Sequence, residues 1–278
     1  MSTLSIQNIF ACLVHEKADC IIDLVRNLQC HDPDSTILLY NGGADPRLLD
    51  TVGEAVTAEP VRVVVHPKPQ RMQWGWLHDF ALDCMRFAEE LGPYDTITIV
   101  ESDQLAVRKG YSQCLGAALL GEQGVGMLGN APYRQMQHTT VPPAYTAQQE
   151  HDLWRPFLRR FPRGESKFVY WTHWPSTVFT AEAARSLVRF YDTDRQLQEL
   201  LLQTRIWASE EIVLPTLVAL LGFRIEAHPC SYRYISYSVC YTAEDLRAAL
   251  DDPDVYWIHP IPRALDHPLR RHIRETCR

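Results

Sequence analysis

The sequence lacks an excess of positive charge and a long apolar run. Its formal net charge is −7 over 278 residues, whereas a protein dedicated to nucleic-acid binding normally has a basic surface. No apolar stretch reaches the roughly 20 residues that a helix needs to cross a bilayer. The first residues, MSTLSIQNIFACLVHEK, also lack the basic region of a secretion signal. We therefore expect a cytoplasmic protein that has no membrane span and binds no nucleic acid.

The sequence also lacks closely spaced cysteines. None of its eight cysteines forms a CxxC pair, which argues against a zinc or thioredoxin-type site. Cys12, Cys84 and Cys114 lie in apolar runs, where a buried and reduced thiol is the usual state. We expect a reducing compartment and no paired cysteines.

What the sequence contains is an alternation of strand-type and helix-type patterns. Apolar, β-branched runs at 8–15, 35–40 and 61–66 alternate with helix-type spacing at 20–28 and 45–56. This alternation predicts an α/β fold whose first strands are parallel. Residues 130–165 are rich in Pro, Gln, His, Thr and Arg, and we expect a long loop there with one short helix near 150–161.

An acidic triplet ends one of the apolar runs. The run 96–100 stops at Glu101-Ser102-Asp103, and open α/β sheets bind ligands at the carboxyl ends of their strands. Residues two apart in an extended chain point to the same side. Two carboxylates on one side suit a divalent cation that carries a diphosphate. A solvated acidic turn is the alternative.

Two further features lie downstream. Ser209-Glu210-Glu211 opens an apolar helical run, where Glu210 suits a capping role at the positive end of the helix dipole. Glu211 is a candidate general base. His259 ends a strand before Pro260, and imidazole joins carboxylates around transition-type divalent ions. A histidine satisfied within the core is the alternative.

The order of these features resembles the layout of GT-A glycosyltransferases. The resemblance implies a Rossmann-like, three-layer α/β/α sandwich with a mixed, mostly parallel central sheet. It also implies that Asp103, Glu101 and His259 hold Mn²⁺ or Mg²⁺ on the donor diphosphate. Glu211 is then the base of an inverting reaction, although a glutamate in this region also suits a retaining one. We expect a single domain over 1–278, with a nucleotide-sugar-binding half at 1–129 and an acceptor-binding and catalytic half at 130–278.

Three segments resemble the family of core-2/I-branching N-acetylglucosaminyltransferases and peptide xylosyltransferases. They are residues 73–76 (QWGW), 174–184 and 209–217, and the resemblance places the family's catalytic glutamate on Glu211. Some members of that family work without a metal and lack the acidic triplet. Many animal members are Golgi membrane proteins with disulfides, which this sequence does not suggest.

Other residues are weaker candidates, because turns, strand ends or a solvated basic helix also explain them. For donor binding they are Val14, His15, Asn41, Arg71, Trp74, Ser102 and Arg263, beside Glu101 and Asp103. For acceptor binding they are Trp174 and Glu210. Arg270 and Arg271 in the basic tail are further candidates for the diphosphate.

The expected activity is transfer of a hexosyl or N-acetylhexosaminyl group. The donor is a nucleotide sugar, expected to be a UDP-sugar, and the acceptor is a hydroxyl of a glycan, a lipid-linked sugar or a natural product. A nucleotidyltransferase is one alternative, but its glycine-rich loop is missing after the first strand, where the sequence reads His15-Glu16-Lys17-Ala18. A non-catalytic nucleotide-sugar-binding protein of the same fold is the other.

Overall fold

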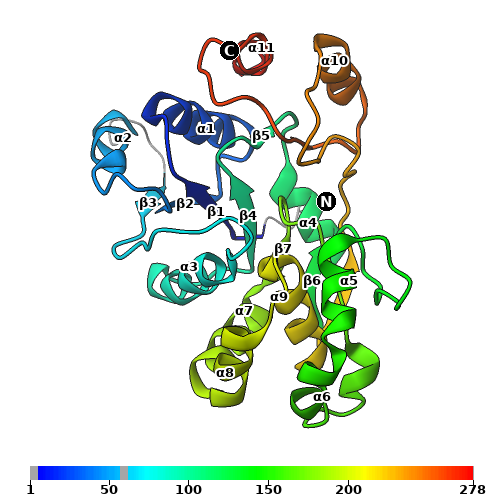
Figure 1. Cartoon of the computed structure of the whole chain (residues 1–278). Helices are drawn as coiled ribbons and strands as arrows, with labels where there is room; N and C mark the ends of the chain where they lie inside the picture. Colours follow the sequence, from blue (N-terminus) through cyan, green and yellow to red (C-terminus); the bar gives the residue numbers. More distant parts are fainter. Residues whose placement is uncertain (1–5, 57–61, 278) are drawn as a thin grey trace. The chain divides into compact units, whose positions relative to one another are not determined.

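The chain forms two compact units that are interleaved along the sequence (Figure 1). The computed structural model describes residues 6–56 and 62–277. Unit 1 comprises residues 1–71, 93–121 and 229–278, and unit 2 comprises residues 72–92 and 122–228. Each unit therefore takes segments from both sides of residue 130. The expected single domain and its division at residue 129 stay predictions.

Unit 1 is built on four parallel strands in the order β3–β2–β1–β4. Both β1 and β2 are buried along their whole length, which explains why they read as continuous apolar runs rather than alternating ones. The strands are β1 (Asn8–Val14), β2 (Thr36–Asn41), β3 (Val63–Val65) and β4 (Thr96–Glu101). The expected third strand begins at Val61, which lies outside the described residues.

Two helices connect the first three strands of this unit, a third helix follows β5 (Leu105–Ala106), and the C-terminal segment adds further elements. The connecting helices are α1 (Ala18–His31) and α2 (Leu48–Val56), and the helix after β5 is α4 (Tyr111–Leu119). The C-terminal segment forms α10 (Ala243–Asp251), β9 (Trp257–Ile258) and α11 (Pro268–Glu275), and β9 pairs antiparallel with β5 (Leu105–Ala106). This pairing brings the last strand of the chain next to the segment that follows β4.

The C-terminal helix is fastened to α1 by a buried ion-pair cluster. Arg270 on α11 is 0% exposed, and its Nη1 lies 2.8 Å from Oδ2 of Asp23 on α1. Arg274 Nη1 lies 2.9 Å from the other Asp23 oxygen. The prediction that Arg270 covers a diphosphate or lies on a solvated helix is therefore wrong, because its guanidinium is used inside the fold.

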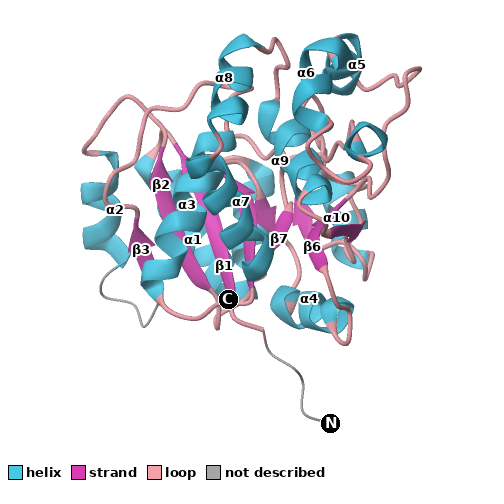
Figure 2. Cartoon of the chain, turned by 90° about the horizontal axis from the view of Figure 1, so that it is seen from below, coloured by secondary structure: helices cyan, strands magenta, loops and turns pink. Residues whose placement is uncertain are grey.

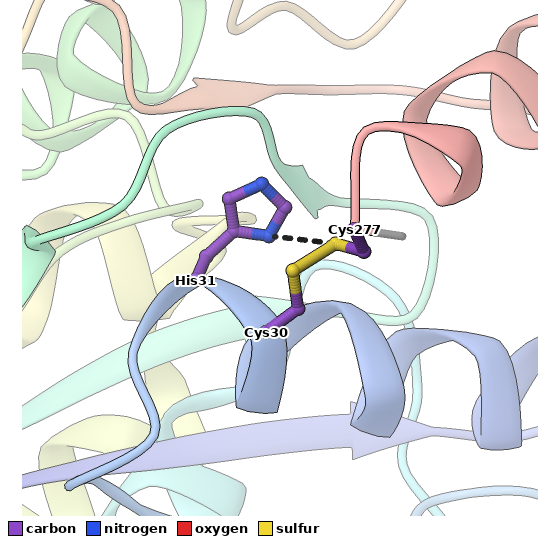
Figure 3. Close-up of side chains that lie close together, drawn as sticks. All are labelled: Cys30, His31 and Cys277. Carbon is purple, nitrogen blue, oxygen red and sulfur yellow. Dashed lines mark hydrogen bonds between the residues drawn. A yellow bond between two sulfur atoms is a disulfide. The ribbon is translucent and has the colours of Figure 1, made fainter.

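A disulfide joins the same two elements (Figure 3). It links Cys30, in the last turn of α1, to Cys277, which follows α11, across a sequence separation of 247 residues. The Nδ1 atom of His31 lies 3.6 Å from Cys277 Sγ. Cys12, Cys84 and Cys114 are free thiols as expected, but the prediction of no paired cysteines is wrong. Sequence spacing could not reveal this pair, because only the fold brings the chain's end back to α1.

Unit 2 contains a smaller, mixed set of strands (Figure 2). Strand β6 pairs antiparallel with β7 and parallel with β8. The strands are β6 (Val125–Gly129), β7 (Val178–Thr180) and β8 (Arg224–Ala227). The longer helices are α3 (His78–Leu91), α7 (Ala181–Thr193), α8 (Arg195–Gln203) and α9 (Ser209–Leu220). Helix α9 is buried along its whole length.

Residues 130–165 are more helical than expected. They form α5 (Pro142–Gln149) and α6 (His151–Leu158), followed by the short 3₁₀ turn Gly164–Lys167. The long-loop prediction is wrong for 142–149 because Pro142 and Pro143 occupy the first positions of α5, where proline starts a helix rather than breaking it.

The expected fold class is confirmed. Both units are α/β. The pairs β1–β2, β1–β4, β2–β3 and β6–β8 are parallel, whereas β6–β7 and β5–β9 are antiparallel. Among the described residues, no helix combines the length and apolar character that a membrane crossing requires.

Candidate active site

The acidic triplet forms a tight turn at the carboxyl end of β4. Gln104 closes the turn: its backbone N–H donates to Glu101 O at 3.0 Å, and its side-chain oxygen accepts from Glu101 N at 3.3 Å. Gln104 is 0% exposed, so its side chain fixes the turn from inside. The backbone of Ile261 donates to Asp103 O at 2.7 Å, which ties the turn to the C-terminal segment.

His259 faces both carboxylates of this turn. Its Nε2 lies 3.0 Å from Glu101 Oε2 and 3.2 Å from Asp103 Oδ1. The backbone on both sides is held, because His259 N donates to Tyr234 O and Ser236 N donates to His259 O, each at 2.9 Å. The imidazole is 2% exposed. The structure thus brings together the three residues that the sequence proposed as metal ligands.

Arg263 completes the cluster. Its Nη2 lies 3.0 Å from Asp103 Oδ2, and its Nε donates to Ser102 Oγ at 2.7 Å. Glu16, which the sequence placed with Val14 and His15 at the end of the first strand as a candidate contact for the donor base, lies 4.0 Å from the Arg263 Nε. The sequence did not predict that Glu16 lies near Arg263, because Glu16 reaches this cluster only through the parallel pairing of β1 and β4.

The cluster is electrostatically coupled. Burial alone would lower the pKa of His259, but hydrogen bonds to Asp103 and Glu101 and the charges of both raise it to about 9. Burial works to raise the pKa of Asp103, but its hydrogen bond to His259 and the charges of His259 and Arg263 lower it overall. A proton on His259 therefore offsets the two carboxylates in the structure described here.

The same atoms fit a divalent cation. Glu101, Asp103 and His259 each offer one ligand atom, and these atoms lie within 4.8 Å of one another. Ligand atoms at right angles around an ion, bound at about 2.1 Å, are about 3 Å apart, which matches the 3.0 and 3.2 Å separations. Carboxylate and imidazole together suit Mn²⁺-type ions, and carboxylates suit Mg²⁺. The residues present therefore fit the expected metal.

The other predicted donor-binding residues of unit 1 lie at strand ends and in loops. Asn41 is used in its own turn: its side-chain oxygen accepts from Gly43 N at 3.0 Å and its amide donates to Asp45 O at 2.7 Å. A Cβ on Gly43 would lie 2.4 Å from His15 O, so only glycine fits there. Val14 is fully buried, and Arg71 is exposed. Their contacts with a donor stay predictions.

His15 lies beside the metal-ligand cluster. Burial and the charge of Arg263 lower the pKa of His15, and the nearby carboxylates oppose this shift. Its side chain is 40% exposed and lies 3.9 Å from the Glu16 carboxylate. The ring therefore remains accessible to a ligand.

A second group of predicted residues meets at the start of α9 in unit 2. Glu211 is 4% exposed, and its carboxylate accepts from Trp171 Nε1 at 2.9 Å and from Trp174 N at 3.3 Å. Glu210 is also 4% exposed, and its Oε2 accepts from Leu77 N at 2.9 Å. The structural role expected for Glu210 thus takes the form of anchoring the 73–77 turn.

Three aromatic or polar residues of this group were not connected to the glutamates by sequence reasoning. Trp171 is the hydrogen-bond partner of Glu211, His78 Nδ1 lies 2.6 Å from Ser209 Oγ, and Trp207 contacts the Trp74 ring. Trp174, the predicted acceptor-binding residue, is 0% exposed. Its role stays a prediction, and its ring presents no surface in this structure.

No protein-family model matches the chain, and no curated protein matches it. Among solved structures, an active-site mutant of LgtC is similar with a TM-score of 0.52 and 8% sequence identity, over 97% of this chain and 94% of that one. The mannosyltransferase PcManGT from Pyrobaculum calidifontis, in complex with GDP-Man and Mn²⁺, has a TM-score of 0.46 and 14% identity over 87% of this chain.

The chain spans 60% of the length of that mannosyltransferase. The bifunctional glycosyltransferase WbbM has a TM-score of 0.44 and 10% identity, over 81% of this chain and 39% of that one. At these identities the likeness to LgtC concerns the fold alone. It agrees with the GT-A-type class expected from the sequence.

Proposed function

We propose that the protein is a metal-assisted glycosyltransferase that moves a sugar from a nucleotide-diphosphate donor, a UDP-sugar in the first instance, to a hydroxyl acceptor. The observation that supports this most is the convergence of Glu101, Asp103 and His259 at the end of β4. This position is where open α/β sheets bind nucleotides, and the donor set is one that a divalent cation accepts.

The chain's own groups suggest how the donor is held. Asp103, Glu101 and His259 would hold Mn²⁺ or Mg²⁺, which when bound supplies positive charge that offsets the charge developing on the leaving diphosphate. Arg263 would contribute a guanidinium for phosphate oxygens; in the structure it is oriented by Ser102 Oγ and Asp103 Oδ2.

Glu211 is the proposed general base for the acceptor hydroxyl in an inverting reaction. Its carboxylate is fixed in orientation by N–H donors from the Trp171 side chain and the Trp174 backbone. A base that is already oriented loses little freedom when it takes up the acceptor proton. Inversion at the anomeric carbon belongs to the same proposal.

A donor screen tests the proposed function. The full chain is mixed with UDP-, GDP- and TDP-sugars, with Mn²⁺ or with EDTA, and both thermal shift and nucleotide release are measured. We expect a metal-dependent shift with at least one donor and slow release of nucleoside diphosphate. Asp103→Asn should lose the shift, whereas Asp50→Asn, an exposed position on α2, should keep it. No shift with any sugar nucleotide or nucleoside diphosphate would contradict the proposal.

A further inference from the structure

Two tryptophans of unit 2 form an exposed aromatic pair, here called the tryptophan platform. Trp74 is 74% exposed and Trp207 is 38% exposed. Their ring centroids lie 5.7 Å apart, and the ring planes are inclined by 33°. In the same unit, Trp154 and Trp174 are almost completely buried, at 1% and 0%. Leaving two large rings in water forgoes the burial that usually stabilises tryptophan, so the platform suggests a binding surface.

The backbone beneath the platform is held in place. Ser209 N donates to Gly75 O at 3.1 Å, and Trp76 N donates to Gln73 O at 3.0 Å. Leu77 N donates to the buried Glu210 carboxylate. Gly75 has a φ of +80°, and a Cβ there would lie 3.4 Å from Ala208 N. Residues other than glycine rarely adopt such a φ. Glycine therefore allows the turn at residue 75 to lie close to the backbone of Ala208.

The platform adjoins the proposed base along the chain and through these hydrogen bonds. The first turn of α9 supplies Ser209, which binds the Gly75 carbonyl, and Glu211, which accepts from the half-buried Trp171 side chain. One helix turn therefore connects two exposed aromatic rings to a carboxylate that can accept a hydroxyl proton. A ligand suited to both features has a flat apolar face and a rim of hydroxyl groups.

The platform is too small for a protein partner. A tryptophan buries about 150–250 Å² when fully covered, so two partly exposed rings offer well under about 500 Å². A standard protein interface needs about 800 Å² from each partner. One sugar ring has the matching size, because its axial C–H groups form an apolar face and its hydroxyls lie around the edge.

We propose that Trp74 and Trp207 bind a pyranose ring of a carbohydrate acceptor by stacking. This inference rests on the proposed function, because it assigns the acceptor of the same reaction to the class of glycans. It also gives Trp74 a role with the acceptor, whereas the sequence suggested Trp74 as a candidate for donor binding.

The test measures glycoside binding without any donor. Methyl glycosides of glucose, galactose, mannose and N-acetylglucosamine are titrated into the full chain, and binding is followed by saturation-transfer NMR of the glycoside protons. At least one glycoside should bind, and Trp74→Ala and Trp207→Ala should each weaken it about fivefold or more. Trp74→Phe should retain part of the binding, because a flat ring remains.

Tyr145→Ala is the matched control, since Tyr145 is another exposed ring of unit 2, on α5 and 51% exposed; it should leave glycoside binding unchanged.

The metal-dependent donor shift should persist in both tryptophan variants. The inference is overturned if no glycoside binds the wild type, if Trp74→Ala binds as well as the wild type, or if Trp74→Ala loses the donor shift while keeping glycoside binding. A change of oligomeric state in Trp74→Ala, measured by light scattering, would point to a second copy as the occupant and also overturn it. If no donor shifts the melting temperature of the wild type, the proposed function is contradicted, whereas the glycoside titration still tests the tryptophan platform by itself.

Discussion

His259 follows Glu101 by 158 positions in the sequence, yet its Nε2 lies 3.0 Å from the Glu101 carboxylate. The contact exists because β9 pairs with β5, directly after the acidic turn. His259 is 2% exposed, so the contact lies inside the fold rather than on a solvated surface. The imidazole and the carboxylates therefore form one site and not two.

Removing His259 should weaken the metal site. His259→Ala removes one of three candidate ligands, and loss of a group that merely orients a ligand already weakens metal binding about 10- to 100-fold. We expect Mn²⁺ affinity, measured by isothermal titration calorimetry, to fall at least about tenfold. His272→Ala, at an exposed position on α11, should leave it unchanged. Equal Mn²⁺ affinity in both variants would remove His259 from the site.

Glu211→Gln should separate catalysis from binding. The amide keeps the size of the side chain and an oxygen for Trp171 Nε1, but it cannot take a proton. Loss of a general base typically slows turnover about 10²- to 10⁴-fold. We therefore expect nucleotide release with acceptor to fall by this factor while the donor thermal shift persists. Glu199→Gln, on the exposed side of α8, is the control, and full activity of Glu211→Gln would exclude it as the base.

Breaking the disulfide should lower stability. The link between Cys30 and Cys277 spans 247 residues of sequence, and removing a disulfide that closes a long loop typically costs about 2–5 kcal/mol. Cys277→Ser should lower the thermal midpoint, and a reductant should lower that of the wild type but not of the variant. Cys240→Ser alters an exposed free cysteine and should have little effect. A wild type insensitive to reductant would show that the link adds no stability.

Substitutions in the buried ion-pair cluster of Asp23, Arg270 and Arg274 should have non-additive effects on the free energy of unfolding. Arg270→Met leaves the buried Asp23 carboxylate with Arg274 alone, and breaking a buried pair from one side costs about 3–5 kcal/mol. Urea unfolding should show a loss of this order, and adding Asp23→Asn should recover much of it because no buried charge remains. Arg271→Met, on the exposed side of α11, should stay within about 0.5 kcal/mol of the wild type. Additive effects of the two substitutions would argue against the coupling.

Asp32 should make stability depend on acid pH. Burial raises the pKa of Asp32 in the folded state, although hydrogen bonds from Ser112 and Ser35 oppose this. A raised folded pKa favours folding below the unfolded value of about 3.9, and this contribution is lost as the pH rises through the folded pKa. Asp32→Asn should therefore gain stability relative to the wild type as the pH rises above the unfolded value of about 3.9, as measured by urea unfolding at each pH. Asp50→Asn is the exposed control. A difference that does not change with pH would contradict the expected shift.

Local sequence patterns were enough to predict the features that depend on a single strand or turn. The runs that became β1, β2 and β4 are buried on both faces, so their apolar continuity reports their position directly. The turn after β4 was equally visible, because the apolar run gives way to Glu101-Ser102-Asp103 within one residue of the strand's end. By contrast, the sequence around Pro142 and Pro143 was predicted to be a loop. The two prolines occupy the first positions of α5, where the missing backbone N–H would have no partner within the helix in any case.

By itself, the sequence determined the α/β class, the parallel start of the fold and the identity of Glu101, Asp103, Glu211 and His259 as candidates, because these depend on periodicity and on residue chemistry. Only the tertiary structure decided which of them meet. Pairing of β5 with β9 placed His259 on the acidic turn, and the return of the C-terminus to α1 joined Cys30 to Cys277. It also left Trp74 and Trp207 exposed beside each other while burying Trp174. Contacts between residues this far apart depend on how whole elements pack, and local sequence patterns do not encode that packing.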